Sequence, residues 1–193
     1  MDKPAAFRLV ACLGNPGQKF VGTRHNIGFQ FADELARRSL CDFKIDTKWN
    51  AETAQSGGRT FMKPQTFMNL SGESVGEFSR YYKIQPAEVL VVIDDISLPL
   101  GALRLRKSGS SGGHNGLESI LVHLGTEAVP RLRIGIGAPG NSTIQNHVLG
   151  RFEKDELPLV EDAVLRAADA FEYANARGID AAMNQFNQKP QEQ

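Results

Sequence analysis

The stretch Glu88-Val-Leu-Val-Val-Ile-Asp94, EVLVVID in one-letter code, decides the fold class of this 193-residue chain. Its unbroken apolar run, mostly β-branched, is typical of a short strand that is buried on both faces. Such strands belong to sheets that helices cover on both sides. A second apolar run, FRLVACL at 7–13, ends at Gly14 and predicts another buried strand.

The residues between these two strands predict helices and a hairpin. In chain order, the expected elements are a helix over 26–40, short strands over 43–49, 51–56 and 59–64, and a helix over 71–82. Asn26 and Ser71 are the candidate caps of the two helices, and Gly57 and Gly58 form the hairpin turn. Pro86 marks the end of this unit.

The residues after Asp94 continue the alternation of strands and helices. The expected elements are a half-exposed strand over 102–106, a glycine-rich loop over 108–116, a helix over 117–125, an alternating strand over 131–137 and a long amphipathic helix over 155–178. Pro158 falls near the start of the last helix, where proline is tolerated. The pattern predicts one α/β domain with a mixed sheet over residues 1–187, followed by a disordered tail at 188–193.

Composition narrows the class of protein. The chain is 41% hydrophobic, carries no apolar run long enough to span a membrane, and begins without the features of a signal or transit peptide. Cys12 and Cys41 lie outside any CxxC motif and are interpreted as reduced thiols. Together these features predict a soluble cytoplasmic protein.

The formal net charge is zero, but the charges are sorted along the chain. Four segments contain basic residues and no acid: 3–32, 53–72, 96–117 and 128–152. A segregated basic surface indicates binding of a polyanion such as a nucleic acid. The alternative is that these loops lack acidic residues by chance.

Polar residues with catalytic potential follow several of the predicted strands. Ligands of α/β sheets bind beyond the carboxyl ends of the strands. The residues near such ends are His25, Asn69, Asp94 and Asn115. A histidine is the natural general base near neutral pH, and a carboxylate such as Asp94 can fix its tautomer and stabilise its cation. His25 alone could equally be a phosphate contact or a turn residue.

Other reaction types have weaker support. No GxSxG motif is present and Cys12 lies within a strand, so activation of water is favoured over a covalent route. The four histidines show no metal-binding spacing, although a metal site at His25, Asp94 and Asp95 is conceivable. We therefore expect no metal and no other cofactor.

The glycine-rich loop and the asparagines also suggest binding. The loop matches neither the P-loop nor the dinucleotide-binding pattern, yet its backbone N–H groups could hold one phosphate, with Arg104, Arg106 and Lys107 beside it. A tight turn is the alternative. The amides of Asn15, Asn26, Asn69 and Asn115 suit recognition of esters and peptide groups, or serve the turns in which they lie.

Taken together, these residues show that the chain resembles bacterial-type peptidyl-tRNA hydrolases. The matching segments, in family order from residue 13 to 152, are LGNPGQKFVGTRHNIG, KPQTFMNLSGESV, VIDDISLPLGALRLRKSGSSGGHNGLESI, RLRIGIGAP and HVLGRF. The resemblance implies a monomeric three-layer α/β/α sandwich with a mixed, mostly parallel, twisted sheet and no metal. It also implies cleavage of the ester between a peptide and tRNA, with peptidyl-tRNA bound through its acceptor stem and 3′ end, no membrane and no obligate protein partner.

The same resemblance implies roles for individual residues. His25 matches the general base, Asp94 the carboxylate that orients it, and Asn15 the residue that distinguishes blocked from free aminoacyl groups. The implied substrate contacts are Phe20, Phe67, Asn69 and Asn115, and the expected tRNA phosphate contacts are Arg104, Arg106, Lys107 and Arg133. Two positions depart from the family pattern. Phe20 replaces the usual tyrosine and loses its hydroxyl, and Ser97 replaces an aspartate and loses its charge.

Two other classes of function remain open from the sequence. A catalytically idle relative would bind RNA as a structural partner, and a different α/β hydrolase would act on a small ester or nucleotide. An ester-cleavage assay separates the first from an enzyme, and competition by bulk tRNA separates the second.

Overall fold

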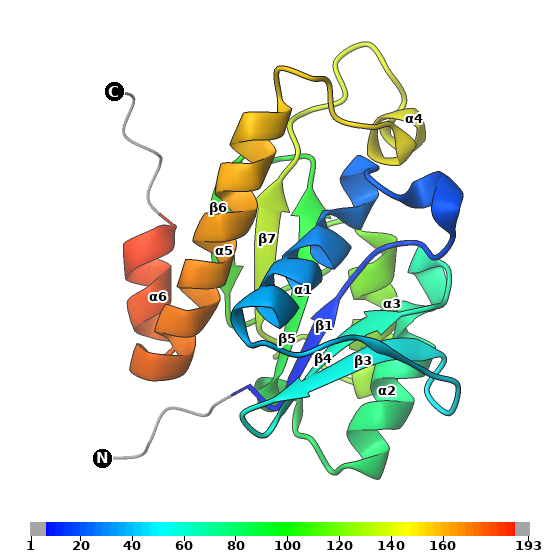
Figure 1. Ribbon diagram of the computed structural model, residues 1–193, viewed down its shortest axis with the longest axis vertical. Coiled ribbons are helices and arrows are strands. Elements are labelled where there is room, and N and C mark those ends of the chain that lie inside the picture. The colour runs from blue at the N-terminus through cyan, green and yellow to red at the C-terminus, as the bar shows by residue number, and fades with distance from the viewer. Residues whose placement is uncertain (1–6, 188–193) are drawn as a thin grey trace.

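A computed structural model describes residues 7–187 and contains a seven-stranded sheet with the strand order β2-β3-β4-β1-β5-β7-β6 (Figure 1). The strands are β1 (Leu9–Cys12), β2 (Lys44–Asp46), β3 (Ala51–Ser56), β4 (Arg59–Pro64), β5 (Val89–Asp95), β6 (Leu103–Arg106) and β7 (Arg131–Gly135). The central strands β4, β1, β5 and β7 are parallel, whereas β3 and β6 run antiparallel to their neighbours. The mixed sheet and its parallel centre confirm the predicted fold class.

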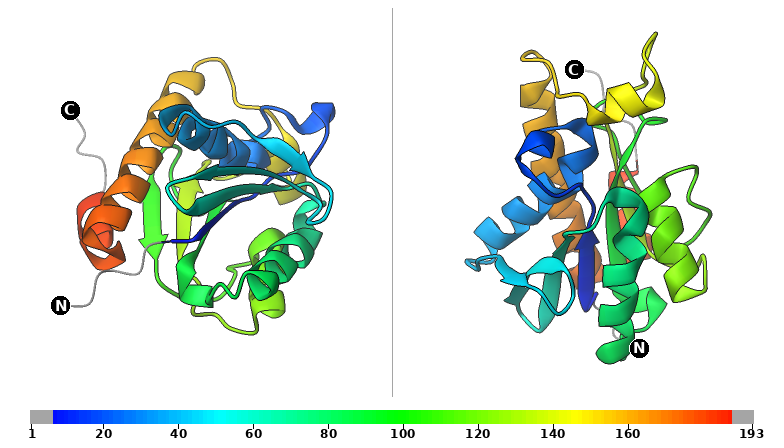
Figure 2. Two further views of the ribbon diagram at one scale, coloured as in Figure 1. Left: turned by 60° about the horizontal axis from the view of Figure 1, so that its bottom comes forward. Right: turned by 90° about the vertical axis from the view of Figure 1, so that its right-hand side faces the viewer.

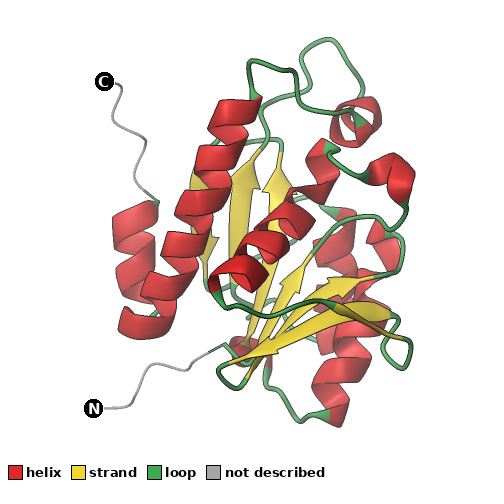
Figure 3. Cartoon of the chain, in the orientation of Figure 1, coloured by secondary structure: helices red, strands yellow, loops and turns green. Residues whose placement is uncertain are grey.

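Helices cover both faces of the sheet (Figures 2 and 3). They are α1 (Ile27–Arg38), α2 (Ser71–Tyr81), α3 (Asn115–Leu124), α4 (Ile144–Leu149), α5 (Leu157–Arg177) and α6 (Ile179–Phe186). One apolar core joins the sheet to α1, α5 and α6, and a second joins it to α2 and α3. The molecule is therefore a single-domain, three-layer α/β/α sandwich.

Side chains of the central strands alternate between the two cores. In β5, Leu90 and Val92 belong to the core of α1 and α5, whereas Val89, Val91 and Ile93 belong to the core of α2 and α3. All five are buried, which explains the unbroken apolar run in the sequence. Because the strand period is two, the next residue, Asp94, is directed to the α1 side of the sheet.

The N-cap position predicted for Asn26 is confirmed, but neither candidate side chain caps its helix. Asn26 stands at the N-cap of α1, but its side chain makes no capping bond and instead bonds the backbone of Asn15. Ser71 lies within α2, and its hydroxyl donates to the carbonyl of Met68. Short 3₁₀ helices, η2 (Arg24–Asn26) and η3 (Met68–Leu70), lead directly into α1 and α2. The backbone is thus already turned where side-chain capping needs an extended residue.

Three helices, α3, α4 and α6, differ from the expectation. α3 begins at Asn115 rather than 117 because the His114 ring accepts from the backbone N–H of Leu117 and caps the helix. The short helices α4 and α6 were not predicted. α6 packs against β6, and the amide of Asn187 bonds both the N–H and the carbonyl of Leu105 there. The tail expected to be disordered, 188–193, lies outside the described residues.

The strand expected over 131–137 is shorter and more buried than its alternating pattern indicates. Arg131 is almost wholly buried, because its guanidinium donates to the backbone carbonyls of Gly109, Val129 and Glu127. The long helix over 155–178 is confirmed as α5, with Pro158 in its first turn. Between residues 7 and 187, no helix combines the length and apolar character needed to cross a membrane.

Candidate active site

A cavity of about 750 Å³ opens where the parallel strands end. Its walls come from segments far apart in the sequence, including the loop after β1, the end of β5, the glycine-rich loop and α4. Eight predicted site residues line it: Asn15, Phe20, His25, Phe67, Asn69, Asp94, Asn115 and Arg133. The tertiary structure therefore gathers residues whose convergence the sequence left open.

His25 lies in η2 and its ring meets Asp94 at the end of β5. Nδ1 of His25 is 2.7 Å from Oδ1 of Asp94, and both side chains are largely buried. Gly28 permits this approach, because a Cβ there would lie 2.4 Å from the carbonyl oxygen of Leu13 and 3.0 Å from that of Val92. The first turn of α1 can thus pack directly on the ends of β1 and β5, which brings His25 to the carboxylate.

A second histidine, His114, reaches the same carboxylate from the glycine-rich loop. Its Nε2 is 3.0 Å from Oδ1 of Asp94, and the two histidine rings lie 5.2 Å apart. Burial alone would raise the pKa of the Asp94 carboxyl, but the charge that His114 and His25 can carry, and their hydrogen bonds, hold this pKa well below its ordinary range. His114 was not among the site residues predicted from the sequence, although it directly precedes Asn115 in the GGHNG segment.

Hydrogen bonding assigns the tautomer of His114. The backbone N–H of Leu117 donates to Nδ1 at 3.2 Å, so Nδ1 is an acceptor and the neutral ring carries its proton on Nε2, facing Asp94. His114 is therefore held as a hydrogen-bond donor. The ligand atoms of His25, Asp94 and His114 lie within 4.8 Å of one another. Metal coordination through Nε2 of His114 would, however, force its proton onto Nδ1, against the Leu117 N–H.

Asn15, in the loop after β1, is held by three hydrogen bonds. Its backbone N–H and carbonyl each bond the Asn26 side chain at 2.9 Å. Its own Oδ1 accepts from the backbone N–H of Met68 at 2.9 Å. The acceptor end of the Asn15 amide is thereby occupied, and Nδ2 is the donor that remains for a ligand.

Close packing of α3 on η3 positions the other two asparagines. A Cβ on Gly116 would lie 2.5 Å from Sδ of Met68 and 2.8 Å from Cδ1 of Leu13, so only glycine allows this contact. Asn69, in η3, and Asn115, the first residue of α3, are both exposed at the cavity. Their amides stand on elements that the packing holds together.

Two aromatic rings also line the cavity. Phe67 precedes η3 and is 58% exposed, so much of its ring faces the cavity. Phe20 is half-buried, and Nζ of Lys19 lies 4.8 Å from the centre of its ring. Exposed flat rings of this kind can stack on a planar ligand group.

The predicted basic residues divide between the two faces of the sheet. Arg104 of β6 pairs directly with Arg133 of β7, and Arg106 lies on the same face. Lys107 is directed to the other side, where its Nζ is 2.7 Å from Oδ1 of Asp180 in α6. Among these residues only Arg133 lines the cavity.

Asp95 orients Arg133 rather than joining the histidines. Oδ2 of Asp95 is 2.7 Å from Nε of Arg133, while Oδ1 accepts from the N–H and hydroxyl of Ser97 at 2.8 and 2.7 Å. Both carboxylate oxygens of Asp95 thus contact residues other than His25. The metal site conceived at His25, Asp94 and Asp95 does not match this arrangement.

Comparison with known proteins places this site in a family. The family described as peptidyl-tRNA hydrolase matches residues 9–193. Proteins of that name from Alkaliphilus metalliredigens and Akkermansia muciniphila are 47% and 44% identical, over 93% and 98% of this chain and 98% and 100% of their own. The crystal structure of peptidyl-tRNA hydrolase from Acinetobacter baumannii superimposes with a TM-score of 0.90 at 35% identity, over 97% of both chains. The chain belongs to the peptidyl-tRNA hydrolase family, a family of hydrolases.

Proposed function

We propose that this protein hydrolyses the ester bond between a peptide, or an N-blocked amino acid, and tRNA, releasing the tRNA for reuse in translation. The observation that carries the proposal is the His25–Asp94 pair on the wall of a deep cavity in a member of this family. The cavity is lined by residues of one chain, and we expect the enzyme to act as a monomer. We also expect it to act in the cytoplasm, as the sequence predicts.

In the proposed mechanism, His25 is the general base. Its Nδ1–H donates to Asp94, which leaves Nε2 to take a proton from water while the water oxygen attacks the ester carbonyl. Asp94 stabilises the resulting imidazolium. When the tetrahedral intermediate collapses, the ribose oxygen leaves and takes the proton back from Nε2. His114 donates to the same carboxylate oxygen and keeps it in place.

The asparagines supply neutral hydrogen bonds around the reacting ester. The side-chain amides of Asn69 and Asn115 can hold the attacking water or the developing oxyanion, where a preorganised donor has its largest effect. Nδ2 of Asn15 can donate to the carbonyl of the peptide bond next to the ester. A free aminoacyl group has an ammonium there, which offers only donors, so Asn15 favours blocked substrates.

Binding of tRNA is assigned to the rings and the arginines. Phe20 and Phe67 would stack on the terminal nucleotide at the 3′ end, Phe20 without the hydroxyl that the family usually carries. Arg104, Arg106 and Arg133 form one basic face for the phosphates of the acceptor stem. Lys107, which the sequence also assigns to this role, would have to leave Asp180 to take part.

The general base is tested with His25→Ala on N-acetylated aminoacyl-tRNA. We expect turnover to fall by about 100-fold or more, since a general base contributes that much, with tRNA affinity retained. His123→Ala is the matched control, because His123 lies on α3 away from the cavity and its ring bonds Ser119 of its own helix. That variant should keep wild-type turnover.

If a folded His25→Ala enzyme that still binds tRNA kept a turnover near that of the wild type, His25 would not be the general base. The wild-type enzyme is also assayed with a metal chelator. Unchanged turnover agrees with water activation by histidine, and a loss that zinc restores would support metal chemistry at this site instead.

A further inference from the structure

Arg24 directly precedes His25 and points away from the cavity into the protein. Its side chain is only 9% exposed and makes a two-point ion pair with Glu156, at 3.1 Å for Nη1 to Oε1 and 2.6 Å for Nη2 to Oε2. Nη1 also donates to the carbonyl of Ile136, and the guanidinium lies 4.7 Å from the centre of the Phe152 ring. Such a buried cation is tolerated because both of its terminal nitrogens are paired and an aromatic ring lies against it.

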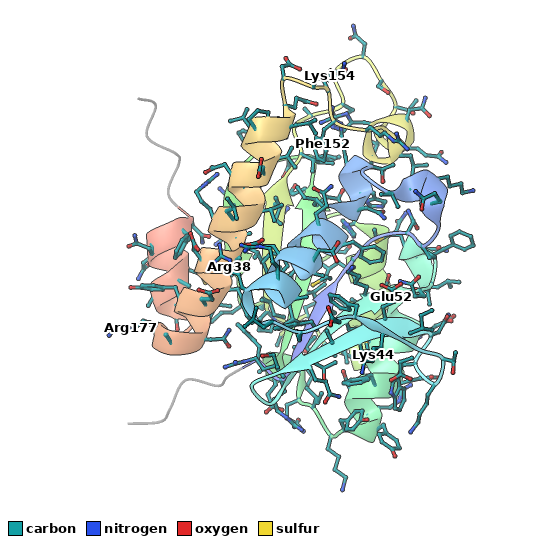
Figure 4. All side chains as sticks on the ribbon, in the orientation of Figure 1. Arg38, Lys44, Glu52, Phe152, Lys154 and Arg177 are labelled. Carbon is teal, nitrogen blue, oxygen red and sulfur yellow. The ribbon has the colours of Figure 1, made fainter. Side chains whose placement is uncertain are left out.

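These contacts join η2 to one long stretch of chain, residues 136–156. The backbone adds to them, since the N–H of Arg24 donates to the carbonyl of Gly150 at 2.9 Å and Thr23 forms a β-bridge with Arg151. The stretch runs from the end of β7 through α4 to the start of α5 (Figure 1). Figure 4 shows Phe152 at the end of the molecule where α4 and the first turn of α5 lie.

The same stretch forms part of the cavity wall. Ile144, Gln145, Val148 and Leu149 of α4 line the cavity, and Gly150, which holds the Arg24 backbone, follows them immediately. His25 therefore stands between two attachments. Its ring is tied to Asp94 on one side, and its backbone is tied through Arg24 to the 136–156 stretch on the other.

We propose that Arg24 is a positioning residue that clamps η2 to the 136–156 stretch and so holds the His25 ring in line with Asp94. The inference rests on the proposed role of His25 as the base. η2 is a single 3₁₀ turn. Its internal bonds, from the N–H of Asn26 to the carbonyl of Thr23 and from the N–H of Ile27 to the carbonyl of Arg24, fix the shape of the turn, whereas its orientation depends on contacts with other segments. A displacement of about 1 Å at a reacting group can cost a factor of about 100 in rate.

The partner carboxylate is adapted to this pairing. Burial would raise the pKa of Glu156, but the hydrogen bonds and charge of Arg24, with the backbone N–H of Glu153, lower it below its ordinary value. Glu156 stands at the entry to α5, the longest helix, so the clamp is anchored on a rigid element. Lysine could not replace arginine fully, because a single ammonium cannot pair with both carboxylate oxygens and the Ile136 carbonyl while covering Phe152.

The experiment compares Arg24→Gln, Arg24→Lys, Glu156→Gln and the double variant Arg24→Gln/Glu156→Gln. For Arg24→Gln we expect kcat on N-acetylated aminoacyl-tRNA to fall by about 10- to 100-fold, with KM much less affected. In Glu156→Gln, kcat should fall less than in Arg24→Gln, because the carbonyl of Ile136 and the ring of Phe152 still hold Arg24. The kcat of the double variant should be no lower than that of Arg24→Gln alone, and the kcat of Arg24→Lys should lie between those of Arg24→Gln and the wild type.

A second readout reports the ring itself. The proton on Nδ1 of His25, shared with Asp94, should give a strongly downfield proton resonance in the wild type, identified by its loss in His25→Ala. Arg24→Gln should weaken or shift this resonance. The matched control is Arg38→Gln, which removes a comparably paired arginine that joins α1 to Asp169 and Glu172 of α5 far from the cavity (Figure 4). It should lower the melting temperature yet keep both kcat and the resonance.

A folded Arg24→Gln enzyme with wild-type kcat and an unchanged resonance would overturn the clamp. Equal losses of kcat in Arg24→Gln and Arg38→Gln would reduce Arg24 to a general contributor to stability and overturn it as well. The proposed function fails separately, if His25→Ala remains active. In that case the resonance still shows whether Arg24 positions the ring.

Discussion

At the scale of single residues, the site depends on one oxygen atom, Oδ1 of Asp94. It accepts a hydrogen bond from His25 and another from His114, and it lies at the buried end of the central strand β5. The two histidines are not equivalent, because His114 is committed to Leu117 through its other nitrogen. In the proposed mechanism, His25 is therefore the ring whose second nitrogen acts on water.

Asp94→Asn tests this assignment with little change of shape. We expect kcat to fall by about 100-fold or more, because an amide cannot stabilise the imidazolium and can pair with the wrong tautomer of His25. The measurement is kcat and KM on N-acetylated aminoacyl-tRNA. Asp95→Asn is the matched control, since Asp95 pairs with Arg133 and should change KM rather than kcat. If Asp95→Asn lowered kcat and Asp94→Asn changed only KM, Asp95 rather than Asp94 would be the partner of the general base.

At the scale of elements, two glycines decide how closely helices approach the ends of strands. Gly28 lets the start of α1 meet β1 and β5, and Gly116 lets the start of α3 meet η3. Gly28 follows His25 by three positions, and Gly116 directly follows Asn115. In the sequence they are indistinguishable from turn glycines, because nothing local shows which backbone or side chain would collide with a Cβ.

The α1–α5 contact carries a prediction on stability and pH. Glu34 is largely buried and bonds Arg37 and Arg38, and these hydrogen bonds, that of Arg37 first, lower the pKa of Glu34 to about 2. Because the carboxyl of Glu34 in the unfolded chain takes up its proton near its ordinary pKa of 4.5, the contribution of Glu34 to stability is complete above pH 4.5 and is lost as the pH falls toward 2. We expect Glu34→Gln to reduce the free energy of unfolding by about 1–3 kcal/mol at pH 7.

Chemical denaturation of wild type and Glu34→Gln between pH 7 and pH 2.5 measures this difference. The gap between the two should narrow as the pH drops. Asp162→Asn serves as the control, because Asp162 is exposed and pairs with Arg166 at the surface, where a pair contributes less than about 1 kcal/mol. If the difference in free energy of unfolding between wild type and Glu34→Gln stays constant with pH, the ionisation of Glu34 does not contribute to stability.

At the scale of the whole molecule, the neutral net charge conceals a basic face. The register of β6 and β7 places Arg104 opposite Arg133 and Arg106 opposite Arg131. Arg131 is buried by carbonyl groups and Arg133 pairs with Asp95, whereas Arg104 is half-buried and Arg106 is exposed. The acid-free segments of the sequence predict a basic surface, and the register shows that Arg104, Arg106 and Arg133 share one face of the sheet.

The salt dependence of tRNA binding tests this face. We expect Arg106→Ala to weaken binding and to reduce the slope of log affinity against log salt by about 1, because one phosphate contact is lost. Lys107→Ala is the companion variant, since Lys107 pairs with Asp180 on the opposite face. An unchanged slope for Lys107→Ala would place the footprint on the arginine face alone. A slope unchanged by Arg106→Ala would remove Arg106 from that footprint.

The sequence by itself determined the layered fold and predicted the principal site residues. An unbroken apolar run in a strand and a period of 3.6 in a helix are local properties, so Val89 to Ile93 and Ile27 to Leu35 could be assigned from their own neighbours. The long family motifs likewise pointed to His25 and Asp94, and the structure places them in contact.

Only the tertiary structure decided which groups pair across the chain. His114 shares Asp94, Arg24 finds Glu156, and Asn26 bonds Asn15 instead of capping its helix. Arg24 and Glu156 are 132 residues apart in sequence, and Asp94 and His114 are 20 apart. A hydrogen-bond partner is selected by proximity and burial after the layers have packed, and a linear sequence carries neither of these quantities directly.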